Sequence, residues 1–251
     1  MVAIIKDKVI KYSIIIPTLN EEKLLPNLLS QLTKDKLMEE YNCEIIVSDG
    51  GSKDNTVGIA VTHSDTVKVH SLQTKQNIAA GRNEGARYAN GEILIFINGD
   101  ILFKNVSSFF DFLNKKFLLS KYSAMTCKVK VFPDEEKFSD KLFHSIYNTY
   151  FRLLNDFGLG MGRGECQVVR KNVFQKVGGY NESLAAGEDF DLFRRIRKTG
   201  KIFYANDMCI YESPRRYRKI GYNGVSWSWL MNGISVFFKN KSISKEWEQV
   251  R

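Results

Sequence analysis

"EILIFINGDILF", residues 92–103, places an apolar run directly before a polar turn. The run from Ile93 to Ile97 is short and rich in β-branched side chains, which predicts a strand buried on both faces. It ends on Asn98, Gly99 and Asp100. Asn-Gly is a common surface turn, because Asn hydrogen-bonds to its own backbone and Gly tolerates positive φ. The alternative is a turn that holds a ligand at the end of a buried strand.

Strands and helices alternate through the first half of the chain. Strands are predicted at 12–17, 43–48, 66–72 and 93–97, and helices at about 24–32, 54–61 and 77–89. In the third of these helices, Gly81, Gly85 and Ala89 form a small-residue stripe that lets it lie close to a sheet, and Gly91 ends it. The alternation predicts an α/β fold with a mostly parallel sheet flanked by helices.

Ligands of such sheets bind outside the carboxyl ends of the strands. Three of the predicted strand ends carry the polar segments PTLNEE, SDGGSKD and NGD, each with a carboxylate. If the strands are neighbours, Glu21 or Glu22, Asp49 and Asp100 converge on one crevice. That convergence favours the ligand-binding interpretation of the Asn-Gly-Asp turn.

The second half of the chain is less regular. A strand at 123–131 alternates enough to be half-exposed, an amphipathic helix is predicted at 137–158, a strand and a helix follow at 165–180, and a further helix spans 185–202. No linker, low-complexity tract or internal repeat divides the chain. We therefore expect a single domain over residues 1–251.

The composition is that of an ordinary globular protein, with 43% hydrophobic and 26% charged residues. Lys and Arg number 37 against 28 Asp and Glu, a net charge of +9 that favours anionic partners without choosing among nucleotides, nucleic acid and membrane surfaces. The four cysteines form no C-x-x-C pair, which indicates reduced thiols and no zinc site. Charges at Lys6, Asp7 and Lys8 interrupt any signal-peptide core, so a cytoplasmic location is expected.

Four ordered segments carry a family resemblance. They are SIIIPTLNEE, EIIVSDGGSKDNT, AAGRNEGARYANGEILIFINGD and VGGYNESLAAGEDFDLFRRIRKTGK, within residues 12–205. Together they resemble a family 2 glycosyltransferase of the GT-A fold. The resemblance implies an inverting transfer of a sugar from a nucleoside-diphosphate sugar, usually assisted by Mg²⁺ or Mn²⁺. With it we expect a nucleotide-binding half at about 12–105 and an acceptor and catalytic half at about 106–220. The residues that follow predict an aromatic C-terminal helix at about 222–240.

By this resemblance, the first two loops hold the nucleoside. Pro17, Thr18 and Glu21 lie along the base and ribose, and Asp49 accepts a hydrogen bond from the base, which suits the N–H groups of uracil or guanine. The alternative for Asp49 is a carboxylate that only ends a turn. Arg82 stands where the family has an arginine near the nucleotide, and the alternative is an exposed helix arginine.

The Asn-Gly-Asp turn matches the family's D-x-D motif, whose last carboxylate binds the divalent metal. Asp100 matches, but Asn98 replaces the first aspartate with a neutral amide, which weakens a site for a hard cation while still allowing the amide oxygen to ligate. The segment ESPRRYRK, residues 212–219, offers Arg215 and Arg216, with Arg218 and Lys219, to the donor phosphates. Its alternative interpretation is a solvated basic loop.

Glu188 and Asp189 match the family's E-D pair, in which the aspartate is the general base that deprotonates the acceptor hydroxyl. The alternative is structural, because carboxylates also favour the first turn of a helix through capping and the helix dipole. Asp191 lies too far round the same helix to share the role.

The segment VSWSWLMNGISVFF, residues 225–238, is too short and too polar to span a membrane. It is either a core helix or an interfacial helix, whose aromatic side chains beside the basic segment would give peripheral contact with the inner face of the membrane. The expected partners are a nucleotide sugar and an acceptor glycan or lipid-linked acceptor, with no nucleic acid. Two other classes remain: a non-catalytic binder of polyanions or anionic membranes, and a sugar-1-phosphate nucleotidyltransferase, which would need a glycine-rich basic loop after the first strand.

Overall fold

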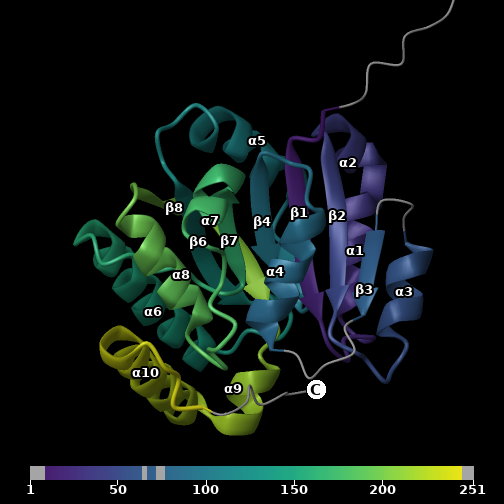
Figure 1. Cartoon of the computed structure of the whole chain (residues 1–251). Coiled ribbons are helices and arrows are strands. Elements are labelled where there is room, and N and C mark those ends of the chain that lie inside the picture. The colour runs from purple at the N-terminus through teal and green to yellow at the C-terminus, as the bar shows by residue number, and fades with distance from the viewer. Residues whose placement is uncertain (1–8, 64–66, 72–76, 245–251) are drawn as a thin grey trace, which may run out of the picture.

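The computed structural model describes residues 9–63, 67–71 and 77–244, and one mixed sheet runs through them (Figure 1). Its strands are β1 (Tyr12–Thr18), β2 (Cys43–Asp49), β3 (Val67–Ser71), β4 (Ile93–Ile97), β5 (Ile101–Phe103), β6 (Ala124–Val131), β7 (Cys166–Arg170) and β8 (Ile202–Glu212). Their order across the sheet is β3-β2-β1-β4-β7-β6-β8-β5. The expected N-terminal segment around Lys6 and the outer limits of the domain lie outside the described residues.

The first half of the sheet is parallel, as the alternation of strands and helices predicted. β1 pairs in parallel with β2 and β4, β2 pairs in parallel with β3, and β6 with β8. β7 is antiparallel to both of its neighbours, and β5 is antiparallel to β8. The α/β prediction is therefore confirmed, and β7 is the antiparallel strand that joins the regular half to the irregular one.

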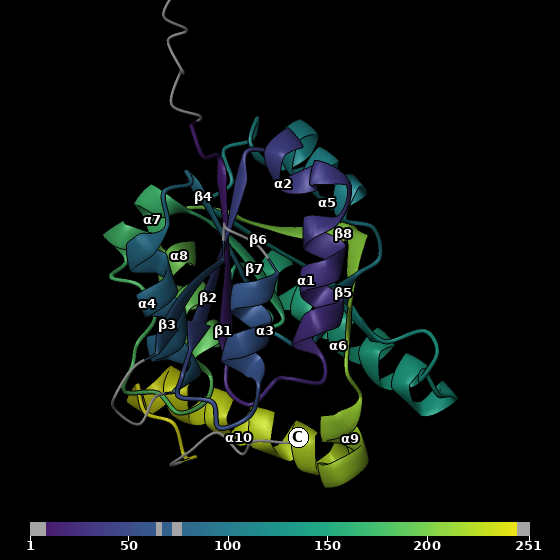
Figure 2. The same cartoon turned by 90° about the vertical axis from the view of Figure 1, so that its right-hand side faces the viewer.

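Helices cover both faces of the sheet (Figure 2). The helices are α1 (Leu25–Thr33), α2 (Leu37–Glu40), α3 (Thr56–Thr62), α4 (Ile78–Tyr88), α5 (Val106–Phe112), α6 (Phe138–Asp156), α7 (Lys171–Lys176), α8 (Glu188–Arg197), α9 (Arg215–Ile220) and α10 (Tyr222–Lys239), with a 3₁₀ turn at Lys34–Lys36 and a π turn at Leu113–Phe117. α1, α2, α3 and α5 pack on one face, and α4, α7 and α8 on the other. Each face buries its own apolar cluster, which makes the sheet the middle of three layers.

The glycine stripe of α4 sets how closely that helix approaches the sheet. A Cβ atom on Gly85 would lie 2.5 Å from Cγ2 of Ile15 in β1, and one on Gly81 would lie 3.3 Å from Cβ of Pro17. Both distances are shorter than ordinary van der Waals contact, so only glycine fits without a shift. The close approach predicted from the sequence is confirmed.

The prediction that the strand at 123–131 is half-exposed was wrong. β6 lies between β7 and β8, and all of its residues are buried except Lys128, which is half-buried, and Lys130, which is exposed. The alternation is confined to the end of the strand, whereas Ala124 to Cys127 lie under both helical layers. An interior strand needs apolar side chains on both faces, and that pattern does not alternate.

α9 and α10 lie beyond the edge of the sheet where β1, β2 and β4 end (Figures 1 and 2). α10 follows the bounds predicted for the C-terminal aromatic helix. It packs against α6 through Tyr147 and Trp229, whose ring centroids are 5.2 Å apart. No helix in the described part of the chain is long and apolar enough to cross a membrane.

Replacing Gly85 with alanine should destabilise the protein. The added methyl group overlaps Ile15, and such overpacking typically costs about 1–3 kcal/mol in the free energy of unfolding. The matched control is Gly233→Ala in α10, where an added Cβ meets open space, so the alanine should stabilise by about 0.5–1 kcal/mol. Urea unfolding of both variants measures the difference. A Gly85→Ala protein as stable as the wild type would show that α4 does not depend on this close contact.

Candidate active site

A cavity of about 1410 Å³ opens at the carboxyl ends of β1, β2 and β4, where the sequence predicted convergence. One wall comes from these strand ends and from the starts of α8 and α9, and another from apolar side chains of α6 and α10. Of the residues predicted for the site, those that line the cavity are Pro17, Thr18, Glu21, Arg82, Asn98, Asp100, Glu188, Asp189, Arg215 and Arg216. The remaining one, Asp49, is not among the lining residues.

Arg82 lies at the centre of this arrangement with a side chain that is 1% exposed, so the exposed-arginine interpretation was wrong. Its Nη1 donates to Glu188 Oε1 at 2.8 Å, and its Nη2 donates to Asn98 Oδ1 at 3.0 Å and to the carbonyl oxygen of Gly164 at 2.7 Å. The ring of Tyr180 lies 5.2 Å from the guanidinium carbon. One buried cation therefore joins α4, the Asn-Gly-Asp turn, the loop before β7 and the start of α8.

Asp49 faces its own turn. Its Oδ2 accepts from the backbone N–H groups of Gly51 and Ser52 at 2.9 and 2.8 Å, and its Oδ1 accepts from Thr18 Oγ1 at 3.1 Å and from Ser52 Oγ. These four bonds occupy the acceptor sites of the carboxylate, and Ser48 and Gly50 on either side line the cavity in its place. The turn-forming role is therefore what the geometry supports, and the contact with a base stays a prediction.

Asp100 and Glu21 share one arginine. Nη2 of Arg215 donates to Glu21 Oε1 at 2.7 Å and to Asp100 Oδ2 at 3.0 Å. The Asp100 side chain is 20% exposed and lines the cavity, so one of its oxygens can reach a cation bound there. The described residues contain no cluster of three or more His, Cys, Asp or Glu side chains suited to a metal. A single carboxylate still fits Mg²⁺, which is commonly held by one or two carboxylates together with substrate phosphates.

The basic segment after β8 divides into two parts. Arg215 and Arg216 line the cavity, as expected for groups that meet the donor phosphates. Arg218 instead pairs with Asp140, to which its Nη1 donates at 2.9 Å, and Tyr222 donates to the same carboxylate at 2.6 Å. These contacts hold the pKa of Asp140 down at about 2 despite its burial. Arg218 therefore fastens α9 to α6 and does not line the cavity.

Glu188 and Asp189 begin α8 from Gly187, whose φ of 80° is the left-handed conformation that glycine adopts freely. Glu188 pairs with Arg82, so it does not cap the helix. Asp189 accepts only a local bond from the N–H of Phe190 at 2.8 Å among the hydrogen bonds found for its carboxylate in the described residues. Burial, and then the neighbouring charge of Glu188, raise the pKa of Asp189 to about 7. Asp191 forms an ion pair with Arg195, at 2.7 Å, which agrees with the prediction that it does not share the role of general base.

The sequence missed a second charged group in the cavity: Arg163, Glu165 and Glu212. Arg163 is buried, and it donates to both glutamates. The only sequence signal was a set of charges in MGRGEC, residues 161–166, and at the end of β8, and neither belongs to the four motifs. Their meeting depends on long-range strand pairing, because β6 lies between β7, which follows Glu165, and β8, which ends at Glu212.

The description "Glycosyl transferase family 2" belongs to the family model that matches residues 13–178, well over half of this chain. The chain belongs to that family. An uncharacterized glycosyltransferase of Haemophilus influenzae is 26% identical over 199 residues, which cover 73% of this chain and 61% of that protein. YfnE, an uncharacterized glycosyltransferase of Bacillus subtilis, is 38% identical over 94 residues, 37% of this chain and 24% of that protein. The chain spans less than two thirds of the length of either relative.

Solved structures of glycosyltransferases share this fold. The mannosyltransferase PcManGT from Pyrobaculum calidifontis, in complex with GDP-Man and Mn²⁺, has a TM-score of 0.68 at 20% identity, covering 87% of this chain and 59% of its own. S. aureus TarS 1-349, in complex with UDP-GlcNAc, has a TM-score of 0.62 at 20% identity, covering 81% and 58%. The GT-A fold expected from the motifs is confirmed. The resemblance to a family 2 glycosyltransferase that the motifs indicated is confirmed by this family match and by relatives that carry the name.

Asp100→Ala should remove most of the Mn²⁺-dependent nucleotide binding, because Asp100 is the only carboxylate of the turn. Asn98→Asp should keep or tighten that binding, since an anionic oxygen replaces the amide next to Arg82. Calorimetry with UDP and GDP, with and without Mn²⁺, measures both effects. The control is Asp134→Ala, which removes an exposed carboxylate elsewhere. Unchanged metal-dependent binding in Asp100→Ala would contradict the assignment.

Proposed function

We propose that this chain transfers a sugar from a UDP- or GDP-linked donor to an acceptor hydroxyl or lipid phosphate, with inversion at the anomeric carbon. The observation that carries the proposal is the position of Asp189, a carboxylate with a pKa near 7, in the same cavity as the Asn-Gly-Asp turn. A base with a pKa close to the working pH is the most effective in proton transfer. The complexes of PcManGT with GDP-Man and of TarS with UDP-GlcNAc support these two nucleotide classes.

The donor nucleoside lies, in this proposal, against the ends of β1 and β2. Pro17, Thr18 and Glu21 line the cavity there, next to Ser48 and Gly50. Asp49 acts from behind by holding the turn that carries Gly50, so that the wall facing the base keeps one shape. Glu21, whose backbone N–H donates to Thr56 Oγ1 at 2.7 Å, is fixed from the α3 side.

The diphosphate lies next to Asp100, Arg215 and Arg216. Asp100 would hold the divalent metal, and Asn98 keeps its amide oxygen on Arg82. A bound divalent cation stabilises the negative charge that develops on the leaving nucleoside diphosphate. Arg215 is held between Glu21 and Asp100, at 2.7 and 3.0 Å, and anionic phosphates compete with these carboxylates for its guanidinium. The binding of the donor therefore redistributes existing ion pairs.

Asp189 removes the proton from the acceptor hydroxyl as the oxygen attacks the anomeric carbon. Its surroundings are fixed by the ion pair between Arg82 and Glu188 and by Gly164, where a Cβ atom would lie 3.3 Å from Asp189 Oδ2. The absence of a side chain at Gly164 leaves Asp189 room on that side. Attack from the side opposite the leaving group gives inversion.

Asp189→Asn should lower turnover by about 10²–10⁴-fold, the usual contribution of a general base, with donor affinity nearly unchanged. The amide is similar in size and still accepts a hydrogen bond, but it does not take up a proton at neutral pH. Transfer rates and donor dissociation constants for the two proteins provide the measurement. A variant within a few-fold of wild-type turnover would assign Asp189 a capping role, because Asn caps as well as Asp.

The pH dependence should carry the same signature. Wild-type turnover should rise with pH through about 7, since Asp189 must lose its proton to act, and Asp189→Asn should lack this limb. Between the ordinary pKa of 3.8 and about 7 the folded protein binds more protons than the unfolded chain, so this group reduces stability as the pH rises. Asp189→Asn should therefore raise the melting temperature more at pH 8 than at pH 5. An equal effect at both values would contradict the raised pKa.

Peripheral contact with an anionic membrane is the second part of the proposal. Exposed apolar side chains form a stripe along α6 and its C-cap, at Phe138, Leu142, Ile146, Tyr150, Leu153 and Phe157. Another stripe runs along α10, at Trp227, Leu230, Ile234, Phe237 and Phe238. α6 and α10 pack together, and members of both stripes line the cavity. Exposed lysines at 137, 141 and 239 flank the stripes. Apolar and aromatic side chains with basic neighbours are typical of interfacial helices.

Flotation with liposomes tests this contact. The wild type should float with anionic vesicles, and Trp227→Ser with Phe238→Ser should reduce flotation, because both side chains are well exposed on α10. The control is Leu119→Ser, which removes an 84% exposed leucine outside α6 and α10. A wild type that stays at the bottom with anionic and neutral vesicles would indicate a soluble acceptor. Concentration-dependent dimerisation that the double variant abolishes would instead assign the stripes to a second copy of the chain.

A further inference from the structure

A second pair of carboxylates adjoins the proposed catalytic groups. Glu165 follows Gly164. The carbonyl oxygen of Gly164 accepts a hydrogen bond from Arg82, and a Cβ atom on Gly164 would lie 3.3 Å from Asp189 Oδ2. Glu212 ends β8 and lies opposite Ile101, directly after Asp100 in the chain. Both glutamates line the same cavity. The pair is therefore next to the proposed base on one side and the proposed metal ligand on the other.

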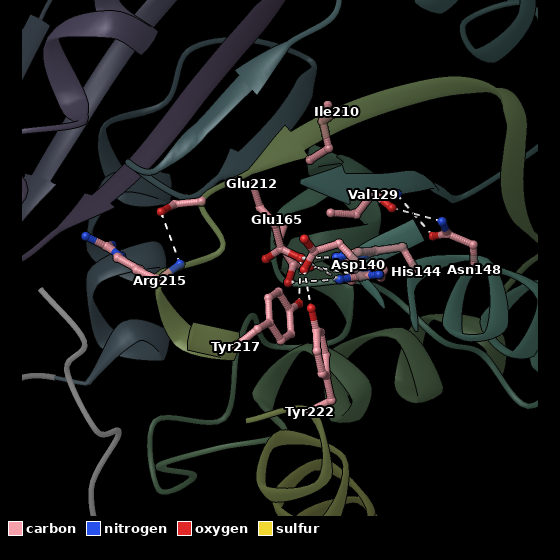
Figure 3. A network of polar contacts seen from close by, with 12 residues as sticks. Val129, Asp140, His144, Asn148, Glu165, Ile210, Glu212, Arg215, Tyr217 and Tyr222 are labelled. Atoms are coloured by element: carbon pink, nitrogen blue, oxygen red, sulfur yellow. Dashed lines mark hydrogen bonds and ion pairs between the residues drawn. The ribbon is translucent and has the colours of Figure 1, made fainter. Parts of the chain in front are cut away.

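Arg163 links the two glutamates. Its Nε and Nη2 donate to Glu165 at 3.1 and 3.3 Å, and its Nη2 also donates to Glu212 Oε1 at 3.2 Å. Tyr217 donates its hydroxyl to the same Glu212 oxygen at 2.7 Å. Figure 3 shows Glu165, Glu212 and Tyr217 converging beside His144. Two carboxylates share one guanidinium, so the group is not positively charged overall.

The protonation of the group follows from burial and these contacts. Burial opposes the charge on Glu165, but Arg163 outweighs it and lowers the pKa of Glu165. Burial and the charge of Glu165 raise the pKa of Glu212. Burial and the charge of Arg163 lower the pKa of His144 to about 3, so the imidazole is neutral at physiological pH and adds no positive charge.

Arg163 also carries an unused donor. Its side chain is only 1% exposed, and Nη1 is buried with no hydrogen-bond partner in the described part of the chain. The guanidinium carbon lies 5.4 Å from the ring of Phe151 and 5.8 Å from that of Trp229. Leaving a buried charged donor unpaired is costly, and native proteins avoid it unless another group takes the bond. Because Arg163 lines the cavity, an oxygen of a bound ligand can take that bond.

The groups in this part of the cavity select a class of ligand. Carboxylate oxygens accept from hydroxyl groups, the spare Arg163 nitrogen donates to an oxygen, and the half-buried Trp229 offers an aromatic face beside them. A neutral sugar ring has donors, acceptors and an apolar face. A phosphate only accepts hydrogen bonds, so it cannot donate to the glutamates, and its negative charge would lie beside two carboxylates that share a single guanidinium.

We propose that Arg163, Glu165, Glu212 and Trp229 form an acceptor subsite that takes a neutral, hydroxyl-bearing sugar ring rather than a phosphate. The inference rests on the proposed transfer reaction and narrows its acceptor. The sugar presents one hydroxyl to Asp189 while its other hydroxyls bond to the glutamates. Where the acceptor is lipid-linked, its apolar portion leaves along the stripes of α6 and α10.

Ligand-observed NMR with small probes tests the subsite. The probes are methyl glucoside, methyl galactoside and methyl N-acetylglucosaminide, with glucose 1-phosphate as the anionic counterpart, added to protein with and without UDP or GDP and Mn²⁺. At least one neutral glycoside should bind more tightly than glucose 1-phosphate to the nucleotide-loaded protein. Glu165→Gln should weaken that glycoside by ~10- to 100-fold, as expected for hydrogen bonds to a charged group. It should also reduce the discrimination against glucose 1-phosphate, because the repelling charge is gone.

Two variants serve as comparisons. Glu92→Gln makes the same change at an exposed glutamate outside the cavity and should leave glycoside binding unchanged. Trp229→Leu should weaken the glycoside while nucleotide affinity stays at the wild-type value. Circular dichroism and melting temperatures establish that each variant folds, and if Glu165→Gln does not fold, Trp229→Leu decides the matter alone.

The outcomes separate the subsite from the proposed reaction. Absence of glycoside binding, equal binding to wild type and folded Glu165→Gln, or tighter binding of glucose 1-phosphate would each overturn the subsite. A lower melting temperature with unchanged glycoside affinity would likewise assign the ion pairs a purely structural role. Failure of UDP and GDP to bind, with glycoside binding that still depends on Glu165, would refute the proposed reaction and leave the subsite standing.

Discussion

The buried guanidinium of Arg82 is the constraint on which the site depends. A fully buried cation is stable only when it is paired and hydrogen-bonded, and Arg82 meets that requirement with groups from three separate segments: Glu188, Asn98 and the Gly164 carbonyl. α4 can bring it there because its glycines allow the helix to lie against β1. The position of the Asn-Gly-Asp turn, the loop before β7 and the start of α8 are thereby set by one side chain. A buried ion pair of this kind contributes more to the choice of one arrangement than to net stability.

The same device recurs around the cavity. Arg163 joins Glu165 to Glu212, and Arg215 joins Glu21 to Asp100. In each case an arginine holds carboxylates that would otherwise repel one another, so the carboxylates are oriented before any ligand arrives. The pairs differ in exposure: Arg82 and Arg163 are buried, whereas Arg215 is partly open. The donor phosphates can therefore exchange with the partners of Arg215, while the two buried pairs remain fixed.

The cavity also has an apolar side, which comes from a different part of the chain. α10 lies beyond the sheet, and it meets α6, which packs on β6, through Phe143, Tyr147 and Trp229. Below their exposed stripes lies the charged group of Arg163, so a path runs from an apolar surface to a polar interior. The proposed membrane contact and the proposed sugar subsite are the two ends of this path. This geometry suits an acceptor whose sugar must reach Asp189 while its remaining part stays outside.

The sequence by itself determined the parallel half of the fold and most of the donor side. Buried strands alternate with helices there, and neighbouring parallel strands end together, as the pairing of Thr18 with Asp49 shows, so polar residues after each strand must lie at one edge. Only the tertiary structure decided the direction in which those side chains face. The carboxylate of Asp49 accepts hydrogen bonds from the backbone of its own turn, whereas Asp100 and Asp189 line the cavity. Only it brought Glu165 and Glu212 together and placed the stripes of α6 and α10 side by side. These pairings join residues far apart in the chain, and no local periodicity or turn chemistry encodes the partner of a distant strand.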